Sequence, residues 1–201
     1  MLKVDGQKDP VMRLLRELQN EAGRVKENLY VVEESELVRR AMDLGARIEA
    51  VVLEDSFAGT AEGRHLSDKA AAAGIKACST SAGLLGKMLG AKPVPDCAAI
   101  VERRLAPLQT ILAAPRPLIQ VVEHCESADN LGMLLRSTDA AGVSGILLTA
   151  DTTDPFSRRA VRGSRGAVFS VPLCIIGDIV KVLESAKQRG IRIVASSAAA
   201  D

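Results

Sequence analysis

Residues 129–143, DNLGMLLRSTDAAGV, decide the fold of this chain. They lie between two apolar runs, and their own apolar residues recur at helical spacing, so the stretch predicts a helix that ends before Gly142. One face of that helix should pack on a sheet, and it is formed by Leu131, Leu134, Leu135 and Thr138. Arg136 points away from this face. A strand, such a helix and a second strand are typical of a parallel sheet covered by helices.

The same alternation continues on both sides of this stretch. Near-continuous apolar runs predict strands at 117–123, 145–150, 168–173 and 191–196. Helices are predicted between them, at 130–141, at about 154–161 and at 178–189. Strands that alternate regularly with helices indicate an α/β fold with a parallel sheet in this half of the chain.

The first half reads as a separate, smaller α/β unit. Its predicted strands are 29–33, 48–54, 75–79 and 97–102, and its predicted helices are 12–18, 36–44, 66–73 and 81–89. The stretch 106–117, APLQTILAAPRP, carries three prolines, which lack the backbone donor that helices and sheets use. We therefore expect a first domain at 1–105, a linker at 106–117 and a second domain at 118–201.

Composition narrows the class of protein. Hydrophobic residues make up 47% of the chain but aromatic residues only 2%, so the core must be aliphatic. No apolar run approaches the roughly 18 residues that cross a bilayer, and the N-terminal residues lack an apolar signal core. We expect a cytoplasmic protein without membrane contact. The net charge of +1 neither requires nor excludes a nucleic acid partner.

The cysteines and histidines favour no metal site. Four cysteines are widely spaced, form no CxxC pair and lie in or beside apolar stretches, which favours buried thiols over disulfides or metal ligands. They are Cys78, Cys97, Cys125 and Cys174. The two histidines, His65 and His124, have no metal-ligand spacing.

Charge gathers locally in one place. Residues 156–172 contain four arginines and no acidic residue, a patch that can hold phosphate. These arginines are Arg158, Arg159, Arg162 and Arg165. On charge alone, a solvated basic helix face is the simpler explanation of the same arginines. The pattern also leaves two readings for Arg136, a solvated or a functional arginine, and two for Asn130, an N-cap or a site residue.

Two motifs resemble a known family. The pattern N-L-G-x-x-x-R-S/T-x-x-x-x-G between two strands, followed by RRAVRGSRGAVFSVPL at 158–173, is similar to the SpoU/TrmH branch of the SPOUT RNA methyltransferases. The variant at 164–166 most resembles the thiostrepton-resistance ribosomal RNA methyltransferases. The first half is similar to the family's small RNA-binding domain, which is like ribosomal protein L30e. Together these similarities cover nearly the whole chain.

The resemblance implies a function and a set of site residues. It implies transfer of a methyl group from S-adenosylmethionine to a ribose 2′-hydroxyl of ribosomal or transfer RNA, by a homodimer whose methyltransferase domain is normally knotted. Arg136 would be the catalytic arginine, with Asn130 holding the loop beside it. Donor contacts are expected from Arg165, Ser196 and Ser197. RNA contacts are expected from Arg162, Ser164, Arg165, Arg24, Lys26, Lys87 and Lys92. A helix-terminal charge and a capping hydroxyl remain the alternatives for Arg165 and Ser164.

The sequence departs from the family pattern at three places. Residues 127–129 read Ser-Ala-Asp where many relatives have Asp-Pro-Gly, and Glu34 stands where relatives often have glycine. The later motifs G-x-E-x-G and I-P-M…S-L-N do not occur in the 201 residues. We therefore expect a C-terminally incomplete methyltransferase domain that binds the donor weakly or not at all. A noncatalytic RNA-binding protein is the alternative function, and a generic nucleotide-binding domain is disfavoured because no G-x-G-x-x-G follows a strand.

Overall fold

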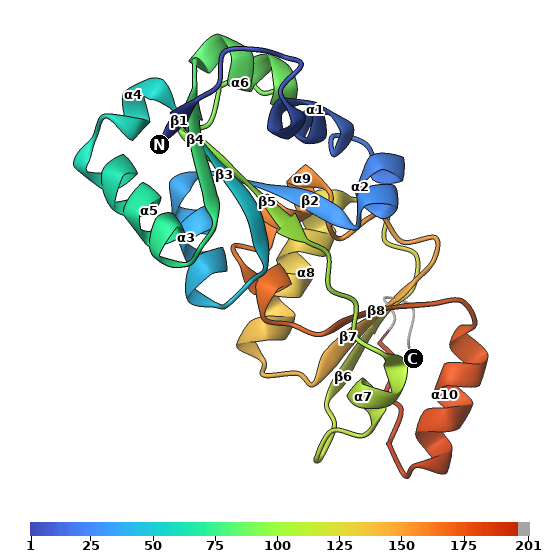
Figure 1. The fold of residues 1–201 in the computed structure, drawn as a ribbon. Helices are drawn as coiled ribbons and strands as arrows, with labels where there is room; N and C mark the ends of the chain where they lie inside the picture. The colour runs from blue at the N-terminus through green and yellow to red at the C-terminus, as the bar shows by residue number, and fades with distance from the viewer. Residues whose placement is uncertain (197–201) are drawn as a thin grey trace.

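The computed structural model describes residues 1–196, which form two β-sheets with helices on their faces (Figure 1). We call residues 1–105, built around the five-stranded sheet A, the first lobe, and residues 106–196, built around the three-stranded sheet B, the second lobe. No helix among residues 1–196 combines the length and the apolar character that a membrane crossing needs.

Sheet A is mixed. Its strand order is β1-β4-β3-β5-β2, in which β1, β4 and β3 run parallel and β5 runs antiparallel to both of its neighbours. The strands are β1 Leu2–Lys3, β2 Leu29–Glu33, β3 Ile48–Glu54, β4 Lys76–Thr80 and β5 Cys97–Glu102. The two central strands, β3 and β5, are buried on both faces, which is why they read in the sequence as apolar runs.

Each face of sheet A has its own helices. On one face lie α1 Pro10–Glu17 and α6 Ala82–Leu89, and on the other α3 Ser35–Asp43 and α5 Ala61–Ala72. Two shorter helices, α2 Glu21–Glu27 and α4 Asp55–Ala58, complete the lobe. Ser81 caps α6, where its hydroxyl accepts a hydrogen bond from the Leu84 amide at 3.3 Å, and Gly90 ends the helix at φ 59°.

Sheet B is parallel throughout, which confirms the prediction for this half of the chain. Its order is β6-β7-β8, with β6 Ile119–Val122, β7 Gly145–Thr149 and β8 Leu173–Ile176. On one side it carries α8 Ala128–Ala140 and α9 Arg158–Gly163, and on the other α7 Leu108–Leu112 and α10 Ile179–Gln188. The predicted inner face of α8 is buried at Leu131, Leu135 and Thr138, while Arg136 is exposed.

Two predicted strands are corrected by the structure. Residues 168–173 begin instead with a 3₁₀ turn, Ala167–Phe169, and β8 starts at Leu173, because the 164–170 backbone satisfies its hydrogen bonds locally. Residues 191–196 form no strand: the Ile191 amide bonds back to Ala186 at the end of α10, and no described strand pairs with the residues after it. Apolar alternation cannot make a strand without a partner.

The predicted linker is also not an extended connection. Within 106–117 the structure contains α7, whose residues Ile111 and Leu112 are buried, and Ile111 packs against sheet B. Gly145 in β7 leaves room for this packing, since a Cβ there would lie 2.8 Å from Ile111 Cδ1. The two lobes are therefore joined by a segment that belongs to the core of the second.

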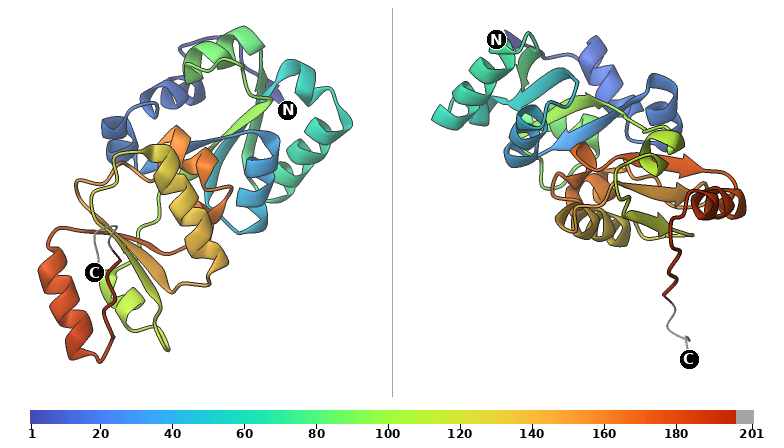
Figure 2. Two further views of the ribbon diagram at one scale, coloured as in Figure 1. Left: turned by 180° about the vertical axis from the view of Figure 1, so that it is seen from behind. Right: turned by 90° about the horizontal axis from the view of Figure 1, so that it is seen from below.

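The two lobes share one hydrophobic core. Its residues come from β2, β3, β5, α3 and α5 of the first lobe and from β6, α8, β7, α9 and β8 of the second. Helices α8 and α9 form a layer between the two sheets (Figure 2). At the contact, the Tyr30 and Phe156 rings lie 5.0 Å apart and the Arg103 guanidinium lies 4.9 Å from the Phe156 ring. A buried ion pair, Arg24 to Asp154 at 2.6 Å, fixes the same contact. Packing and charge together therefore fix the position of one lobe relative to the other.

Candidate functional site

Two glycines bring the two motif segments together. Gly132 on α8 and Gly163 at the end of α9 lie at the crossing of these helices, where a Cβ on Gly132 would lie 2.7 Å from the Ala160 carbonyl oxygen and 2.8 Å from Gly163 Cα. Only a residue without a side chain allows this approach. The glycine of the first motif therefore has a packing role: it lets α8 lie against α9 and so places Arg136 near Arg165.

A cavity of about 490 Å³ opens beside this crossing. It is lined by Arg136 and Asp139 from α8, by Ser164 and Arg165 from the turn after α9, and by Glu36 and Arg40 from α3 of the first lobe. Both lobes therefore contribute to one cavity, and their shared core fixes its shape. The sequence groups Arg136 with Arg165 but gives no signal for the two residues of α3, because they lie about a hundred positions away.

Like Arg165, which forms no ion pair within residues 1–196, Arg136 is a free cation of this cavity. Its side chain is exposed, and within residues 1–196 no acidic group pairs with it. Arg165 stands beside it with φ 50°, in the left-handed region, at the turn that closes on Gly166 at φ 96°. A guanidinium that is held by the fold and lacks a partner can bind a phosphate or stabilise developing negative charge.

Arg40 reaches the cavity from the first lobe. It packs on Gly166, where a Cβ would lie 2.5 Å from Arg40 Cδ, and its Nη2 lies 3.9 Å from Asp139 Oδ2. Asp139 in turn accepts a hydrogen bond from the Ser170 hydroxyl at 2.8 Å. Gly166 of the second motif thus makes room for an arginine from the other lobe.

The arginine patch predicted at 156–172 is not free of acids in space. Arg158 pairs with Glu33 at 2.8 Å, Arg162 with Glu34 at 3.3 Å, and Arg159 with Asp129. Glu33 and Glu34 come from the first lobe, so two of the pairs connect the lobes. Burial raises the pKa of the Glu33 carboxyl, and the charge of Arg158 opposes that change. The patch is in part an interface between lobes.

Two predicted RNA contacts are corrected by their burial. Arg24 is 6% exposed, lies in the ion pair with Asp154 and donates to the Leu18 carbonyl oxygen at 3.0 Å. Ser164 is 1% exposed, and its hydroxyl donates to the Val161 carbonyl oxygen at 2.7 Å and accepts from the Gly166 amide. Neither polar group is available to an RNA, and Ser164 instead shapes the turn that carries Arg165.

The remaining predicted residues are dispersed. Asn130 lies in the first turn of α8, about 9 Å along the axis from Arg136, and does not line the cavity. The cap of α8 is Ser127, whose hydroxyl accepts from the Asn130 amide at 3.3 Å, so Asn130 is not the N-cap. Lys26, Lys87, Lys92 and Ser196 are exposed on other parts of the surface. Ser197 lies outside the described residues.

A polar cluster marks the edge of sheet B where β6 and β7 end. His124, with φ 50°, donates its backbone amide to Thr149 Oγ1 at 3.1 Å, and its ring lies 2.9 Å from Asp151 Oδ2 and 3.1 Å from Glu126 Oε1. Hydrogen bonding to Asp151, and then to Glu126, raises the pKa of His124. Ligands of parallel α/β sheets bind at this carboxyl edge.

The cysteines are free thiols, as predicted. Cys78, Cys97 and Cys174 are buried and Cys125 is half-buried. Burial raises the pKa of Cys78 to about 11 and raises that of Cys97 further, so these thiols are structural at neutral pH.

The family comparison matches the second lobe. Residues 117–201 fit the model of the SpoU rRNA Methylase family, the part of the chain that carries Arg136 and Arg165. This part of the chain is therefore similar to the SpoU family. The match covers both motifs. In this molecule the two motif segments therefore meet where α8 crosses α9.

Longer matches extend over both lobes. An uncharacterized tRNA/rRNA methyltransferase of Synechocystis is 25% identical over 193 residues, which are 94% of this chain and 67% of the relative. The 23S rRNA (guanosine(2553)-2′-O)-methyltransferase of Bacillus subtilis is 21% identical and covers 96% of this chain and 72% of its own length. This chain thus corresponds to about two thirds to three quarters of the length of these relatives.

A solved structure has the same fold across both lobes. The AdoMet-bound rRNA methyltransferase of Sinorhizobium meliloti matches with a TM-score of 0.79 and 26% identity, over 92% of this chain and 69% of the other. The fold of both lobes, and not only that of the SpoU part, is therefore that of known RNA methyltransferases.

The described residues fit only part of a methyl donor. Arg165 lines the 490 Å³ cavity and a smaller one of about 270 Å³, and its guanidinium suits a carboxylate. Around both cavities the lining is charged or small, whereas an adenine needs an apolar enclosure. In the SpoU part of residues 1–196, the cavities at Arg165 therefore fit the amino-acid end of the donor and not its adenosyl group.

Proposed function

We propose that this protein methylates a ribose 2′-hydroxyl of ribosomal or transfer RNA, with S-adenosylmethionine as the methyl donor. One observation carries the proposal: Arg136 of the SpoU motif, which has no acidic partner within residues 1–196, lines a cavity together with Arg165 and with Arg40 of the other lobe. The comparisons support it, because the Bacillus subtilis relative is named as a 23S rRNA 2′-O-methyltransferase and the similar Sinorhizobium meliloti structure is AdoMet-bound.

The donor supplies the methyl group, and the residues described here act on the RNA. The oxygen of a 2′-hydroxyl gains negative charge as its proton passes to solvent water, and this oxygen then takes the methyl group from the sulfonium of the donor, which leaves as a neutral thioether. Arg136 does not take the proton, since a guanidinium keeps its own in proteins. Held beside the hydroxyl, it stabilises that oxygen electrostatically, which is typically worth roughly 3–4 kcal/mol.

The other two arginines of the cavity hold the neighbouring phosphates. Arg40 and Arg165 present planar guanidinium groups that pair with two oxygens at once. Glu36 and Asp139 lie in the same wall and restrict where an anion can sit. The ribose between two such phosphates is then directed toward Arg136. We further propose that the protein acts in the cytoplasm as a homodimer, as the SpoU resemblance implies.

Ribose methylation in a deletion strain tests the proposal. Total RNA from the strain should lack one 2′-O-methyl group, which is mapped as a loss of resistance to alkaline cleavage. The parent gene should restore it. Arg136→Ala should lower the rate of methylation by roughly 100- to 1000-fold, because one preorganised donor is lost.

The matched control is Arg64→Ala, which removes an exposed arginine of α5 that does not line the cavity. It should restore methylation as the parent does. If the deletion changes no ribose methylation, the protein is a noncatalytic RNA-binding protein. If Arg136→Ala methylates at the parent rate, the cavity is not the active site.

A further inference from the structure

A cavity lined by three arginines lies in the second lobe, apart from the cavity at Arg136. It measures about 550 Å³ and opens where α7 and α10 end and the chain enters β6. Arg116 stands in the turn before β6, and Arg189 and Arg192 follow the last residue of α10. We call this cavity the α7–α10 cavity.

The α7–α10 cavity and the cavity at Arg136 lie on opposite faces of sheet B. Along β7, Ile146 and Leu148 pack in the core that includes α8, whereas Leu147 packs in the core that includes α7 and α10. A small molecule in the α7–α10 cavity therefore does not contact Arg136. The cavity is a separate site.

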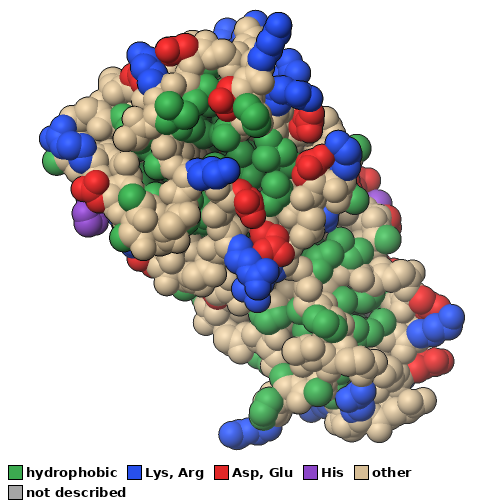
Figure 3. Space-filling model, viewed as in Figure 1, with side chains coloured by type: hydrophobic (Ala, Val, Ile, Leu, Met, Phe, Trp, Pro, Cys, Tyr) green, Lys and Arg blue, Asp and Glu red, His purple; other side chains and the backbone are tan. Residues whose placement is uncertain are grey.

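The charges of the three arginines are not compensated inside the cavity. All three residues are exposed, no acidic residue lines the cavity, and none of the three forms an ion pair within residues 1–196. Arg189 donates to the side-chain oxygen of Gln109 next to α7, and this amide is neutral. Basic side chains are seen at the lower end of the molecule in Figure 3, the end where β6 begins in Figure 1. An anion is therefore attracted to this end of the second lobe.

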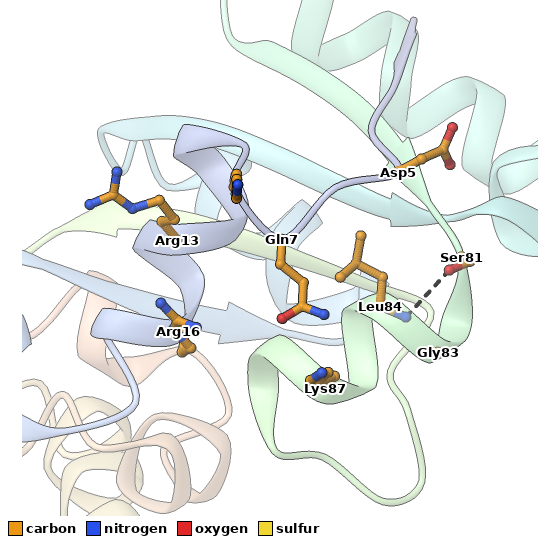
Figure 4. Close-up of a pocket in the computed structure, with 9 residues that line it drawn as sticks. Asp5, Gln7, Arg13, Arg16, Ser81, Gly83, Leu84 and Lys87 are labelled. Carbon is orange, nitrogen blue, oxygen red and sulfur yellow. Dashed lines mark hydrogen bonds between the residues drawn. The ribbon is translucent and has the colours of Figure 1, made fainter.

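A larger basic cavity, between α1 and α6 in the first lobe, is less suited to a compact anion. It measures about 980 Å³, and an acidic residue, Asp5, lies among its lining residues (Figure 4). The α7–α10 cavity holds three guanidinium groups and no carboxylate in little more than half that volume. Positive charge is thus more concentrated in the second lobe.

The backbone holds Arg116 in a conformation that arginine rarely adopts. Its φ is 49°, in the left-handed region, and it stands between Pro115 and Pro117. A residue with a Cβ is strained there, and the proline that follows restricts it further. Such a conformation persists where the neighbouring structure fixes it, which here is α7 on one side and β6 on the other. The fold therefore sets the position of Arg116 at the cavity.

Size and lining together select the class of ligand. A volume of 550 Å³ lies within the range of small-molecule sites, about 300–1,000 Å³. Each guanidinium can pair with two phosphate oxygens at once, so three of them match an anion with two or more charges. Between the arginines the lining is apolar and includes Leu112, Pro117 and Ile191. These residues match an uncharged ring that is joined to the phosphates.

We propose that the α7–α10 cavity binds a small molecule with two or more phosphate groups on a body that contains a ring, the chemistry of a nucleoside diphosphate. The site goes beyond the proposed methylation and does not depend on it. The ligand connects the turn before β6 with the segment after α10, which pairs with no strand within residues 1–196. Its binding should therefore stabilise the folded protein.

Calorimetric titration of the 201-residue chain with ADP tests the site, with pyrophosphate and adenosine as the two halves of the probe. The parent is compared with Arg116→Gln/Arg192→Gln and with a control, Arg64→Gln/Arg104→Gln. Each variant removes two exposed arginines, and the control pair lines neither this cavity nor the one at Arg136. Circular dichroism verifies that all three proteins are folded.

The parent should bind ADP more tightly than pyrophosphate and should not bind adenosine measurably. The cavity variant should weaken ADP binding roughly tenfold or more, because two charge-assisted contacts are lost, and the control should keep the parent affinity. Arg165→Gln should also bind ADP as the parent does, since Arg165 lines the other cavity. Equal affinities of the parent and the cavity variant would overturn the proposal, and the arginines would then only interact with the negative ends of α7 and α10. A loss confined to Arg165→Gln would overturn it as well, because the nucleotide would then lie in the cavity at Arg136.

Arg116→Gly separates binding from folding. Glycine adopts a φ of 49° without strain, so this variant should unfold at about the temperature of the parent or above it. ADP should nevertheless raise its unfolding temperature less than it raises that of the parent, because the guanidinium is lost. An equal rise in both proteins would contradict the proposed site. A parent that binds a short single-stranded RNA through Arg116 and Arg192 but binds no ADP would replace the nucleotide site with an RNA surface.

Discussion

At the scale of single residues, backbone conformation explains one departure from the family pattern. Glu34 stands where relatives often have glycine, and its φ is 75°, in the left-handed region that glycine adopts without strain. In this chain a glutamate occupies the position, and its carboxylate pairs with Arg162 of the other lobe. The side chain therefore makes a contact between lobes that glycine could not make.

The ring of His124 is the residue-scale feature most sensitive to pH. Both neighbouring carboxylates favour its protonated form, so its pKa in the folded protein lies above the ordinary value of 6.5. Because the pKa of His124 is raised on folding, the stabilisation that its protonated ring gains from the two carboxylates is complete below about pH 6.5. This stabilisation is lost as the pH rises through the folded-state pKa. The connection after β6 should thus be held most firmly in mildly acidic solution.

Titration of the His124 ring by NMR checks this pKa. The parent should titrate above 6.5, and Asp151→Asn should move the midpoint back toward 6.5, because the bond to Asp151 is the largest cause of the shift. Glu126→Gln, the matched control, should move it less. A parent midpoint at or below 6.5 would show that the two carboxylates do not face the ring in solution.

At the scale of helices and strands, the crossing of α8 and α9 is what assembles the site. Arg136 and Arg165 are exposed side chains on separate segments, and each alone is an ordinary solvated arginine. The close approach at Gly132 and Gly163 places both in one cavity wall. The distance between the helices, more than the identity of either arginine, therefore determines whether the site exists.

Gly132→Ala tests this crossing. The new Cβ would meet backbone atoms of α9 that cannot move aside alone, so we expect a loss of about 1–3 kcal/mol in the free energy of unfolding. Urea denaturation measures it. Gly83→Ala on α6 is the matched control, because a Cβ there meets nothing within 4 Å, and it should stabilise the protein by up to about 1 kcal/mol. A neutral Gly132→Ala would mean that the helices separate without penalty.

At the scale of the whole molecule, the two lobes form one cooperative unit. Their shared core contains residues of both sheets, and Arg24 and Asp154 are buried together at the contact. Removing one partner of a buried pair leaves the other charge without compensation, which typically costs about 3–5 kcal/mol. The lobes should therefore unfold together, and their contact should be sensitive to this pair.

Asp154→Ala should lower the free energy of unfolding by about 3–5 kcal/mol, whereas Asp68→Ala, at an exposed position of α5, should change it by no more than about 0.5 kcal/mol. Circular dichroism and the fluorescence of Tyr30, the sole tyrosine, follow the transition. Tyr30 lies at the contact with Phe156, so it reports on the junction of the lobes. In the parent, separate midpoints for the two signals would contradict a single unit.

The sequence by itself determined the local elements and their class. Apolar periodicity gave the central strands of sheet A and the parallel strands β6 and β7, and it placed Leu131 and Leu135 inward and Arg136 outward on α8. These features depend on residues three or four positions apart, or on a contiguous apolar run. They can therefore be predicted from the sequence alone. The motif with Arg136 likewise stands within one helix.

Only the tertiary structure decided which charges are free. Arg24 pairs with a carboxylate 130 positions away and Arg158 with one 125 positions away, while Arg136 keeps no acidic partner among the described residues. The spacing of nearby residues does not indicate such partners, because ion pairs between the lobes depend on how the two lobes pack against each other. For the same reason the place of Arg40 in the cavity at Arg136 is seen only when α3 and α8, which are distant in sequence, lie side by side.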